Sequence, residues 1–313
     1  MDKVYYINGT PLSTGYSTPE DFGAKGDGVT DDSIAIQNAV NNKGIILFDS
    51  GKNYKVTSTI RLGKGTTLDL NGSTITSTNK HLFFNFQSSD TFTAYNGNGD
   101  ITIRNGMIVG GALSFAHGEN IRLENIIFKN SLNDHFLEIA GCNNYEIKGC
   151  QFIGMANVST SVQEYINVDP CTHAAFPWLT DGSAFYDGTK NDGIKVNNCY
   201  FSLGDGDYAY GFNAFGVHGV AGQAVKHKNI RLTNNEVLGF TGCGFRINDM
   251  ENVFIANNDI NVEGDGIRVG DVGQSTDVLI KGNVIVASGE AVTKANGSTV
   301  FQSDDNDINP IFS

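Results

Sequence analysis

The sequence predicts an all-β fold, a single right-handed parallel β-helix (solenoid), from three observations. A short strand-and-turn unit recurs along most of the chain. The 313 residues include 38 glycines but only 5 prolines, so the glycines are spread as turn residues and do not form a Pro/Gly low-complexity tract. The one clear helical segment lies near the N-terminus, where an open solenoid needs a cap over its exposed core and strand edges.

The repeat unit is clearest at Asn120, which is followed by Ile121, Leu123, Asn125 and Phe128. The alternation before Asn125 is typical of a strand with one buried face. The fifth position after the anchor is always Asn or Gly, which adopt left-handed backbone conformations at low cost, so a sharp turn is expected there. Eight copies of the unit are anchored at Thr67, Asp100, Asn120, Asn144, Gly193, Asn229, Asn252 and Asp277.

The spacing of the anchors separates a β-helix from a sandwich or propeller. The short spacings of 20 to 25 residues suit one coil, whereas a blade or sandwich needs several strands per period. Two longer spacings place insertions at about 153–192 and 202–228, either as loops or as a further irregular coil. Long loops in a regular scaffold are often functional.

The ends of the domain are also predicted. Residues 1–20 form an N-terminal arm, the β-helix occupies 21–290, and 291–313 form a C-terminal cap or tail. A helix from about Asp31 to Asn41, with Thr30 as its N-cap, is expected to cover the first coil. Its apolar side would consist of Ile34, Ile36, Ala39 and Val40.

Composition limits the partners. The net charge is −13 and no cluster of Lys or Arg interrupts it, which argues against nucleic acid or an anionic membrane as the main partner. No stretch of eighteen apolar residues predicts membrane insertion, and no signal-peptide pattern is expected in the first twenty residues. Five cysteines, an odd number, exclude a complete disulfide framework.

The N-terminal segment carries a family resemblance. The run Asp21–Asp32, DFGAKGDGVTDD, followed by Ala35, Ile36, Gln37 and Ala39, resembles the N-terminal signature of the pectate-lyase superfamily. Phage tailspike depolymerases and polygalacturonase-related glycoside hydrolases share this signature. The resemblance implies the β-helix fold and a polysaccharide ligand, but members hydrolyse, eliminate or only bind.

The phase of the repeat predicts a column of polar side chains on one outer face. It runs through Glu138, Asn167 and Asp169, His218, Arg246 and Arg268, each beside inward-facing aliphatic residues. Adjacent strands are about 5 Å apart and next-adjacent strands about 10 Å. Two carboxyl groups at such separations can flank a glycosidic bond.

This column resembles the active site of polygalacturonase-type hydrolases. Asn167-Val168-Asp169 resembles their N-x-D motif, the segment 216–219 (GVHG) loosely resembles G-H-G, and Arg246-Ile247 or Arg268-Val269 could stand for R-I-K. The departures are an extra residue in GVHG, no lysine after either arginine, and no D-D pair, since Asp205-Gly206-Asp207 is only a near match.

We expect a polysaccharide-degrading glycoside hydrolase in which Asp169 is general acid or nucleophile, while His218 and Arg246 orient the substrate. Its carboxylate partner would be Glu138, or else one of Asp187, Asp205 and Asp207. Neither a metal site nor a cofactor is expected. The expected substrate-binding residues are Asn167, Tyr165, Asp187, Asp205, Asp207, Tyr208, Trp178, Arg268, Glu164 and His135.

Several of these residues also have structural interpretations. Glu138 and Arg246 could form an exposed ion pair, and His218 and Asp169 could be turn residues. His135 shares the phase of inward residues, and Glu164 would be either buried and paired or at a strand start.

Two other functions remain open. In a uronic-acid lyase, Arg246 and Arg268, or a Ca²⁺ held by loop aspartates, would neutralise the substrate carboxylate while His218 or a tyrosine takes the α-proton. In a non-catalytic spike or adhesin, the chain would be extracellular or virion-associated and could assemble as a homotrimer. The aromatics of the insertions, Trp178 and Tyr208 among them, would line a sugar groove or else pack the loops onto the solenoid.

Overall fold

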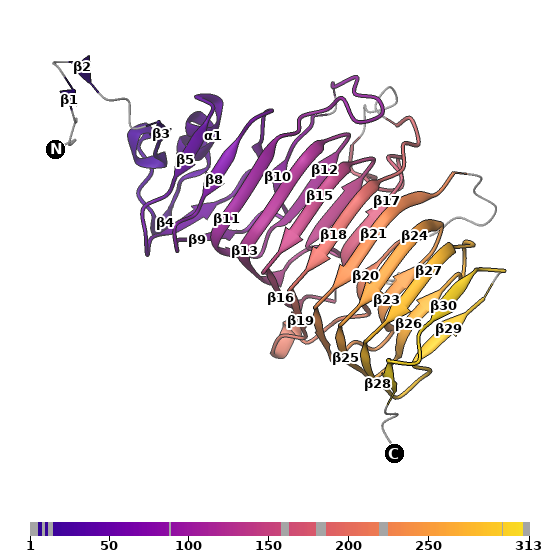
Figure 1. Cartoon of the computed structure of the whole chain (residues 1–313). Coiled ribbons are helices and arrows are strands. Elements are labelled where there is room, and N and C mark those ends of the chain that lie inside the picture. Colours follow the sequence, from indigo (N-terminus) through magenta and orange to yellow (C-terminus); the bar gives the residue numbers. More distant parts are fainter. Residues whose placement is uncertain are drawn as a thin grey trace.

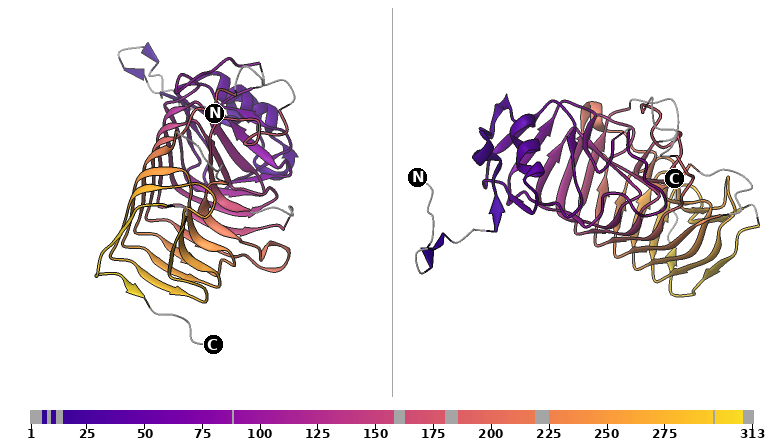
Figure 2. Two further views of the ribbon diagram at one scale, coloured as in Figure 1. Left: turned by 90° about the vertical axis from the view of Figure 1, so that its right-hand side faces the viewer. Right: turned by 90° about the horizontal axis from the view of Figure 1, so that it is seen from above.

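The structure is a computed structural model that describes residues 6–7, 10–11, 15–87, 89–157, 163–179, 186–218, 225–295 and 297–308. Its strands stack as successive coils along one axis, with parallel pairing between neighbouring coils (Figure 1; Figure 2). The chain is therefore a parallel β-helix, as its repeat predicts. A small antiparallel pair, β1 (Tyr6–Ile7) and β2 (Thr10–Pro11), precedes it.

Three faces run the length of the solenoid. Sheet 1 has nine strands: β7 (Ile60–Arg61), β10 (His81–Phe84), β12 (Ala112–Ala116), β14 (Leu137–Ala140), β17 (Glu164–Asp169), β20 (Asn213–Gly216), β23 (Cys243–Ile247), β26 (Asp265–Val269) and β29 (Val292–Lys294).

Sheet 2 contains β3 (Tyr16–Ser17), β5 (Ile45–Leu47), β8 (Thr67–Asp69), β11 (Ile101–Val109), β13 (Glu119–Ser131), β15 (Asn143–Lys148), β18 (Asp192–Asn197), β21 (His227–Thr233), β24 (Met250–Ala256), β27 (Thr276–Lys281) and β30 (Val300–Gln302). Sheet 3 contains β4 (Asp27–Asp31), β6 (Asn53–Val56), β9 (Thr74–Ser77), β16 (Gln151–Met155), β19 (Tyr200–Ser202), β22 (Glu236–Leu238), β25 (Asp259–Val262), β28 (Val284–Ala287) and β31 (Asp307–Ile308). The long strands β11 and β13 bend through both sheets.

The predicted register holds over most of the repeat. Ile101, Ile121 and Tyr145 are successive register partners in sheet 2, and Val253 pairs with Val278 further along. These side chains belong to the hydrophobic core that fills the solenoid.

The copy anchored at Thr67 is two residues out of register. Leu68 pairs with Ile103, not with Ile101 as the repeat predicted, whereas Ile75 pairs with Ile108. The bend between Leu68 and Ile75 is therefore two residues longer than the corresponding bend in β11.

The predicted turn position has the left-handed backbone expected of it. The residues five positions after the anchors include Asn125 (φ 53°), Asn198 (φ 55°) and Asn257 (φ 56°). All the anchors except Thr67 are also left-handed, for example Asn120 (φ 58°) and Asn144 (φ 49°), which the alternation alone did not predict. Each strand of sheet 2 over this region is thus bounded by two residues that bend the chain.

The helix near the N-terminus is shorter than expected. α1 spans Ser33–Asn41 and lies at the N-terminal end of the solenoid (Figure 1). Thr30 is not its N-cap: it belongs to β4 and its hydroxyl donates to Asp27. Ile34 is 76% exposed, while Ile36 is fully buried, because the apolar side of this short helix is narrower than the sequence pattern suggested.

The C-terminal segment continues the coil. The boundary expected at residue 290 is crossed by β29, β30 and β31, which pair with β26, β27 and β28. Pairing therefore extends to Ile308, the last residue that the structure describes.

In the described residues the two insertions are loops and not further coils. Each expanded coil contributes one strand to sheet 1, β17 or β20, and these pair directly with each other. The first insertion packs on the outside of sheet 1. Phe84, Phe86, Cys171 and Phe176 belong to a second hydrophobic cluster there, and Trp178 packs against it. This contact anchors the loop over the N-terminal half of the sheet.

Candidate active site

Sheet 1 carries a polar cluster at its centre, on and beside β14, β17, β20 and β23. Glu138 and Asn167 are register partners, and Asn167 pairs in turn with Gly216. Parallel pairing stacks these positions at about 4.8 Å, which brings side chains from neighbouring coils together. We call the carboxylate–histidine cluster the set formed by His135, Glu138, Glu164, Asn167, Asp169, His218 and Arg246.

Glu138 is held among polar groups and shielded from solvent. Its Oε2 accepts a hydrogen bond from Asn167 Nδ2 at 2.9 Å and lies 3.7 Å from His135 Nε2. Burial, followed by the negative charge of Asp169, raises the pKa of Glu138 well above its usual value, although the Asn167 hydrogen bond works against this shift. Glu138 is therefore a carboxyl group that keeps its proton beyond the normal range.

Asp169 and His218 form the shortest contact between a carboxylate and a histidine side chain in the cluster. His218 Nδ1 lies 3.0 Å from Asp169 Oδ2. Burial alone would raise the pKa of Asp169, but the hydrogen bond and positive charge of His218 lower it. Burial would likewise lower the pKa of His218, but Asp169 and then Glu164 raise it to about 9. Near neutral pH this pair is an ion pair, and His218 keeps 41% of its side chain exposed.

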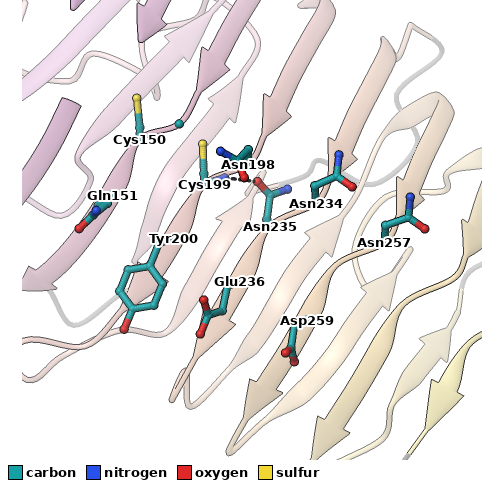
Figure 3. Close-up of a pocket in the computed structure, with 11 residues that line it drawn as sticks. Cys150, Gln151, Asn198, Cys199, Tyr200, Asn234, Asn235, Glu236, Asn257 and Asp259 are labelled. Carbon is teal, nitrogen blue, oxygen red and sulfur yellow. Dashed lines mark hydrogen bonds between the residues drawn. The ribbon is translucent and has the colours of Figure 1, made fainter. Parts of the chain in front are cut away.

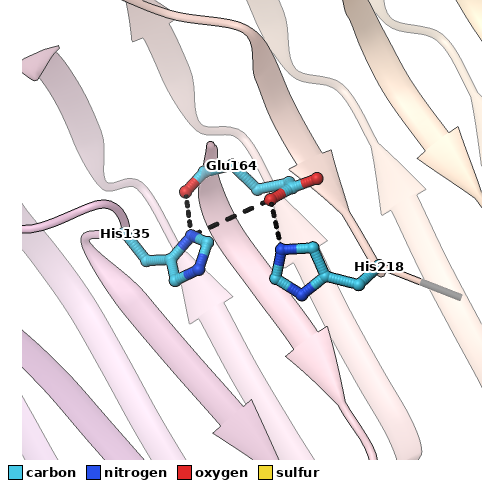
Figure 4. A group of neighbouring side chains, drawn as sticks. All are labelled: His135, Glu164 and His218. Atoms are coloured by element: carbon cyan, nitrogen blue, oxygen red, sulfur yellow. Dashed lines mark hydrogen bonds and ion pairs between the residues drawn. The ribbon is translucent and has the colours of Figure 1, made fainter. Parts of the chain in front are cut away.

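Glu164 is a fully buried carboxylate between two coils. Its Oε1 accepts from Asn213 Nδ2 at 3.1 Å and lies 3.6 Å from Arg246 Nη1, while its Oε2 lies 3.4 Å from His218 Nε2. Arg246 also donates through Nε to Asp271 Oδ2 at 3.1 Å. Figure 4 shows His135, Glu164 and His218 converging from separate segments.

Among the described residues, His135, Glu164 and His218 are near enough to hold a metal ion, with one ligand atom of each within 4.8 Å of the others. The local charges oppose this use. His218 carries a proton at neutral pH, and the Arg246 guanidinium already lies against the same carboxylate. The cluster is thus better suited to exchanging protons and hydrogen bonds with a neutral ligand than to binding a cation.

Two buried oxygens of the cluster, Glu138 Oε1 and Asn167 Oδ1, make no hydrogen bond or ion pair in the described part of the chain. Glu164 Oε2 makes no hydrogen bond there either, and its contact with His218 Nε2 at 3.4 Å is an ion pair. Buried polar atoms are normally satisfied, so these oxygens indicate a place for hydrogen-bonding groups from outside the chain. Sugar hydroxyls are groups of this kind.

A cavity of about 120 Å³ lies beside this cluster. It is lined by Asp169, Pro170, Thr172, Ala174, Lys190, Val217, His218, His227 and Asp249. His227 is fully buried, and burial lowers its pKa to about 3, so it is neutral. The cavity provides room for a small substituent or for part of one sugar ring next to Asp169.

One expected substrate-binding residue, Tyr165, lies outside the cluster, while Glu164 and His135 are part of it. Tyr165 points into the core, where its ring contacts Phe136 and Phe240, because Tyr165 and Ile166 both face inward and the alternation breaks there. Glu164 consequently faces outward, and His135 reaches the cluster instead of the core.

Three other candidates make contacts with the scaffold. Arg268 is the register partner of Arg246 but pairs with Asp265 at 2.9 Å. Asp187 accepts hydrogen bonds from the backbone of Ala94 and Thr189 and so joins two loops. Trp178 stacks on His81 with ring centroids 4.2 Å apart.

Asp205, Asp207 and Tyr208 lie at a different corner. Asp207 and Tyr208 belong to the short 3₁₀ helix η2 (Gly206–Tyr208), which contacts β16 of sheet 3. In the described part of the chain no hydrogen bond or ion pair joins these three residues to the carboxylate–histidine cluster. The near match to a D-D motif therefore marks a loop, not the site.

Sequence reasoning missed Asn213 and Asp271, which hold Glu164 and Arg246 from neighbouring coils. Asn213 carried a signal, because it occupies the sheet 1 strand of the second insertion at the position that pairs with Glu164. Asp271 lies just after β26 and had no motif that would set it apart from a turn residue.

Another hollow, of about 410 Å³, lies at the corner between sheets 2 and 3 (Figure 3). One of its lining residues, Asn235, belongs to a buried asparagine ladder: Asn235 Nδ2 donates to Asn258 Oδ1 at 2.9 Å, and Asn258 Nδ2 donates to Asn283 Oδ1 at 2.9 Å. These groups satisfy one another, so this hollow is part of the coil's turn structure.

The fold and the site define a class of architecture: a parallel β-helix with a carboxylate-rich surface on one sheet. Residues 18–134 match the family described as "Rhamnogalacturonase A/epimerase, pectate lyase-like", which confirms the resemblance of the N-terminal signature. Among the described residues, no helix is long and apolar enough to cross a membrane.

Particular relatives are found in bacteria and phages. Plasmin and fibronectin-binding protein A of Streptococcus pneumoniae is 26% identical over 294 residues, covering 80% of this chain and 40% of that protein. A capsule K30/K69-specific depolymerase of Klebsiella phage K64-1 is 54% identical over 48 residues, 14% of this chain and 6% of that protein. The chain thus spans less than half of the relatives it matches.

Solved structures give the same architecture. The pneumococcal surface protein and adhesin PfbA superposes with a TM-score of 0.77 at 22% identity, covering 95% of this chain and 86% of that chain. A tailspike variant of E. coli bacteriophage HK620 in complex with a pentasaccharide gives 0.64 at 16% identity, covering 95% and 56%. At these identities the likeness concerns the fold.

Proposed function

We propose that the chain is a polysaccharide depolymerase of the glycoside hydrolase type, with Glu138 as general acid and Asp169 as the ionised partner. The observation that carries the proposal is that the pKa values of two neighbouring carboxyl groups, Glu138 and Asp169, are shifted in opposite directions. The pKa of Glu138 is raised by burial and by Asp169, and the pKa of Asp169 is lowered by His218 against its own burial. Glycosidic cleavage needs one protonated and one ionised carboxyl group of this kind.

The surrounding residues have supporting roles in this proposal. Asn167 contacts both Glu138 and the histidine that pairs with Asp169, since its Nδ2 donates to Glu138 and lies 3.4 Å from His218 Nδ1. The unsatisfied Asn167 Oδ1 and Glu164 Oε2 would accept hydrogen bonds from sugar hydroxyls. His218, the most exposed of these groups, would meet the substrate first.

A lyase mechanism is less well supported by the same geometry. A β-elimination base must be unprotonated, whereas the pKa of His218 is about 9. Arg246 lies between Glu164 and Asp271, so its charge is already balanced and less available for a substrate carboxylate.

The second candidate function is a non-catalytic surface adhesin. The observation in its favour is that the relative aligned over most of this chain is named for binding plasmin and fibronectin. In either role we propose that the protein acts outside the cell or on a virion and assembles as a homotrimer, which light scattering coupled to gel filtration would test.

The deciding experiment measures reducing ends released from a panel of bacterial exopolysaccharides by the parent chain, Glu138→Gln and Asp169→Asn. We expect cleavage of at least one polymer by the parent and a loss of about 100-fold or more in each variant, the scale of a removed general acid or base. Asp259→Asn, an exposed carboxylate on sheet 3, is the matched control and should retain full activity.

Two outcomes would contradict the hydrolase. Binding without cleavage across the panel would favour the adhesin. Cleavage accompanied by a near-ultraviolet absorbance from a new C=C bond would favour the lyase.

A further inference from the structure

Sheet 2 carries a second polar column, separate from the candidate active site. Its outward positions are register partners on successive coils: Arg122 with Glu146, Glu146 with Lys195, Lys195 with Arg231, and Arg231 with Phe254. The strands that carry the last four, β15, β18, β21 and β24, lie side by side along the solenoid (Figure 1). We call Lys195, Arg231 and Phe254 the sheet 2 column.

The charges of this column do not balance. The Glu146 carboxylate lies between Arg122 and Lys195 in the register, and it pairs with Arg122, whose Nε lies 3.8 Å from Glu146 Oε2. In the described part of the chain no carboxylate lies within 4.0 Å of Lys195 or Arg231. Lys195 and Arg231 occupy directly neighbouring strand positions, where like charges repel each other. This uncompensated positive pair stands in a protein whose net charge is −13.

Phe254 fixes one of these charges without neutralising it. The Arg231 guanidinium carbon lies 5.4 Å from the centroid of the Phe254 ring, a cation–π arrangement that orients the guanidinium and leaves its full charge available. Beyond Phe254 the column continues through Leu279 and Phe301, which are 38% and 60% exposed.

The same residues line a concavity of about 500 Å³, together with Glu146, Asn197 and Thr233. Sites for small ligands usually occupy about 300–1,000 Å³ and combine apolar walls with a few placed polar groups. The concavity has this composition: the two cations and the aromatic ring of the sheet 2 column, amide and hydroxyl groups from Asn197 and Thr233, and the Glu146 carboxylate, which is paired with Arg122.

We propose that this column is an accessory binding site for an anionic polysaccharide, whose carboxylate groups pair with Lys195 and Arg231. A sugar chain lying along the solenoid would cross successive strands, so that charged groups on neighbouring sugars meet cations on neighbouring coils. Phe254 is a positioning residue that holds Arg231 and offers apolar surface to a sugar ring.

Charge disfavours one alternative occupant, a second copy docked by a twofold contact. In such a contact the same patch faces itself, and each Lys195 and Arg231 would meet the partner's cations. A carboxylated glycan supplies the missing negative charge without that penalty.

The test measures binding of acidic polymers (polygalacturonate, alginate and hyaluronan) by affinity electrophoresis and calorimetry, in an Asp169→Asn background that prevents cleavage at the proposed active site. The uncharged probe is methyl-esterified polygalacturonate, which keeps the sugar backbone and removes the charge. We expect the Asp169→Asn protein to bind at least one acidic polymer and not to bind the esterified one. Its affinity for the acidic polymer should fall as the salt concentration rises.

Lys195→Gln and Arg231→Gln should each weaken that binding about tenfold, the size of one lost charged contact, and Phe254→Leu should weaken it less. Lys228→Gln is the matched control: it removes the same charge from the same strand as Arg231, but Lys228 is paired with Glu251 at 3.7 Å. Its affinity should stay within about twofold of the parent.

The proposal is overturned if the parent binds none of the three acidic polymers, if it binds the esterified polymer equally well, or if the column variants bind as the control does. A change of oligomeric state in the Arg231 variant with unchanged glycan binding would instead assign this face to a contact between copies. The result is independent of the proposed hydrolase, because the column lies on another sheet and binding is measured without cleavage.

Discussion

His218 Nδ1 lies 3.0 Å from Asp169 Oδ2, and the two groups come from strand ends on successive coils of sheet 1. The sequence separates them by 49 residues, yet their ionisation is linked. That link makes stability depend on pH in a definite direction.

The first prediction concerns this dependence. The pKa of His218 rises from 6.5 to about 9 on folding, so its stabilising contribution is complete below pH 6.5 and is lost as pH rises to about 9. The pKa of Asp169 is lowered, so its contribution is present above pH 3.8 and is lost in acid. The melting temperature should therefore fall between pH 6.5 and 9.

The control is His218→Gln, whose melting temperature should change less over the same interval. An equal fall in the parent and in this variant would show that other groups cause the decline. Melting curves at fixed ionic strength would decide, because screening also affects exposed pairs.

The second prediction separates the ionisation of Glu138 from its catalytic role. A raised folded-state pKa means that folding favours the protonated form, so the stabilising contribution is present below pH 4.5 and is lost as pH rises through the folded value. Glu138→Gln keeps a neutral side chain at every pH. Relative to the parent, it should therefore be more stable at pH 7 than at pH 4.5, as measured by urea denaturation at both values.

The sequence predicted the fold in detail because the repeat is local. An anchor, two inward aliphatic residues and a left-handed Asn or Gly define one strand and its bend, and neighbouring coils repeat the same choice. The Thr67 copy was misplaced because the bend after Leu68 has two more residues than the bend after Ile103, which alternation does not reveal.

The candidate site was less predictable, for a physical reason. Strict alternation assigned Tyr165 outward and Glu164 inward, but in β17 both Tyr165 and Ile166 face the core, so the phase reverses at the strand's start. Residues C-terminal to the reversal, Asn167 and Asp169, were placed on the outer face as predicted. Loop residues such as Asp187 had no register at all, and their positions depend on packing between distant segments.

The third prediction corrects an expectation about Trp178. Its ring stacks on His81 and lies 5.6 Å from Phe176, in the cluster that attaches the first insertion to sheet 1. Trp178→Ala should therefore destabilise the fold by about 2–3 kcal/mol, below the range for fully buried aromatics because the side chain is only half-buried.

The measurement compares melting with oligosaccharide affinity on the same variant. An unchanged melting temperature together with weaker oligosaccharide binding would instead indicate that Trp178 lines the sugar groove. Tyr208→Ala, in a separate corner, serves as the comparison.

The fourth prediction concerns the asparagine ladder. Asn258 accepts from the backbone N–H of Asn235 and donates to the carbonyl oxygen of Leu232 and to Asn283. Asn258→Ala would leave several of these buried groups without partners, at about 1–3 kcal/mol each. We expect a loss of roughly 3 kcal/mol or more, whereas Asn261→Ala, exposed on β25, should cost under about 0.5 kcal/mol.

The last prediction tests whether Glu164 and Arg246 depend on each other. Glu164 is fully buried, and Arg246 Nη1 lies 3.6 Å from its Oε1. Arg246→Met would leave a buried carboxylate without its cation, which typically costs about 3–5 kcal/mol. Glu164→Gln should cost less, because Arg246 keeps Asp271 at 3.1 Å and the glutamine amide can still hydrogen-bond within the cluster.

The double variant distinguishes a coupled pair from two independent residues. If the charges are coupled, Glu164→Gln combined with Arg246→Met should be more stable than the sum of the single losses predicts, by about 1–3 kcal/mol. Arg268→Met is the matched control: Arg268 is the register partner of Arg246, but it pairs with Asp265 near the surface and should cost about 1 kcal/mol or less. Additive losses in the double variant would mean that Asp271, and not Glu164, is the partner that holds Arg246.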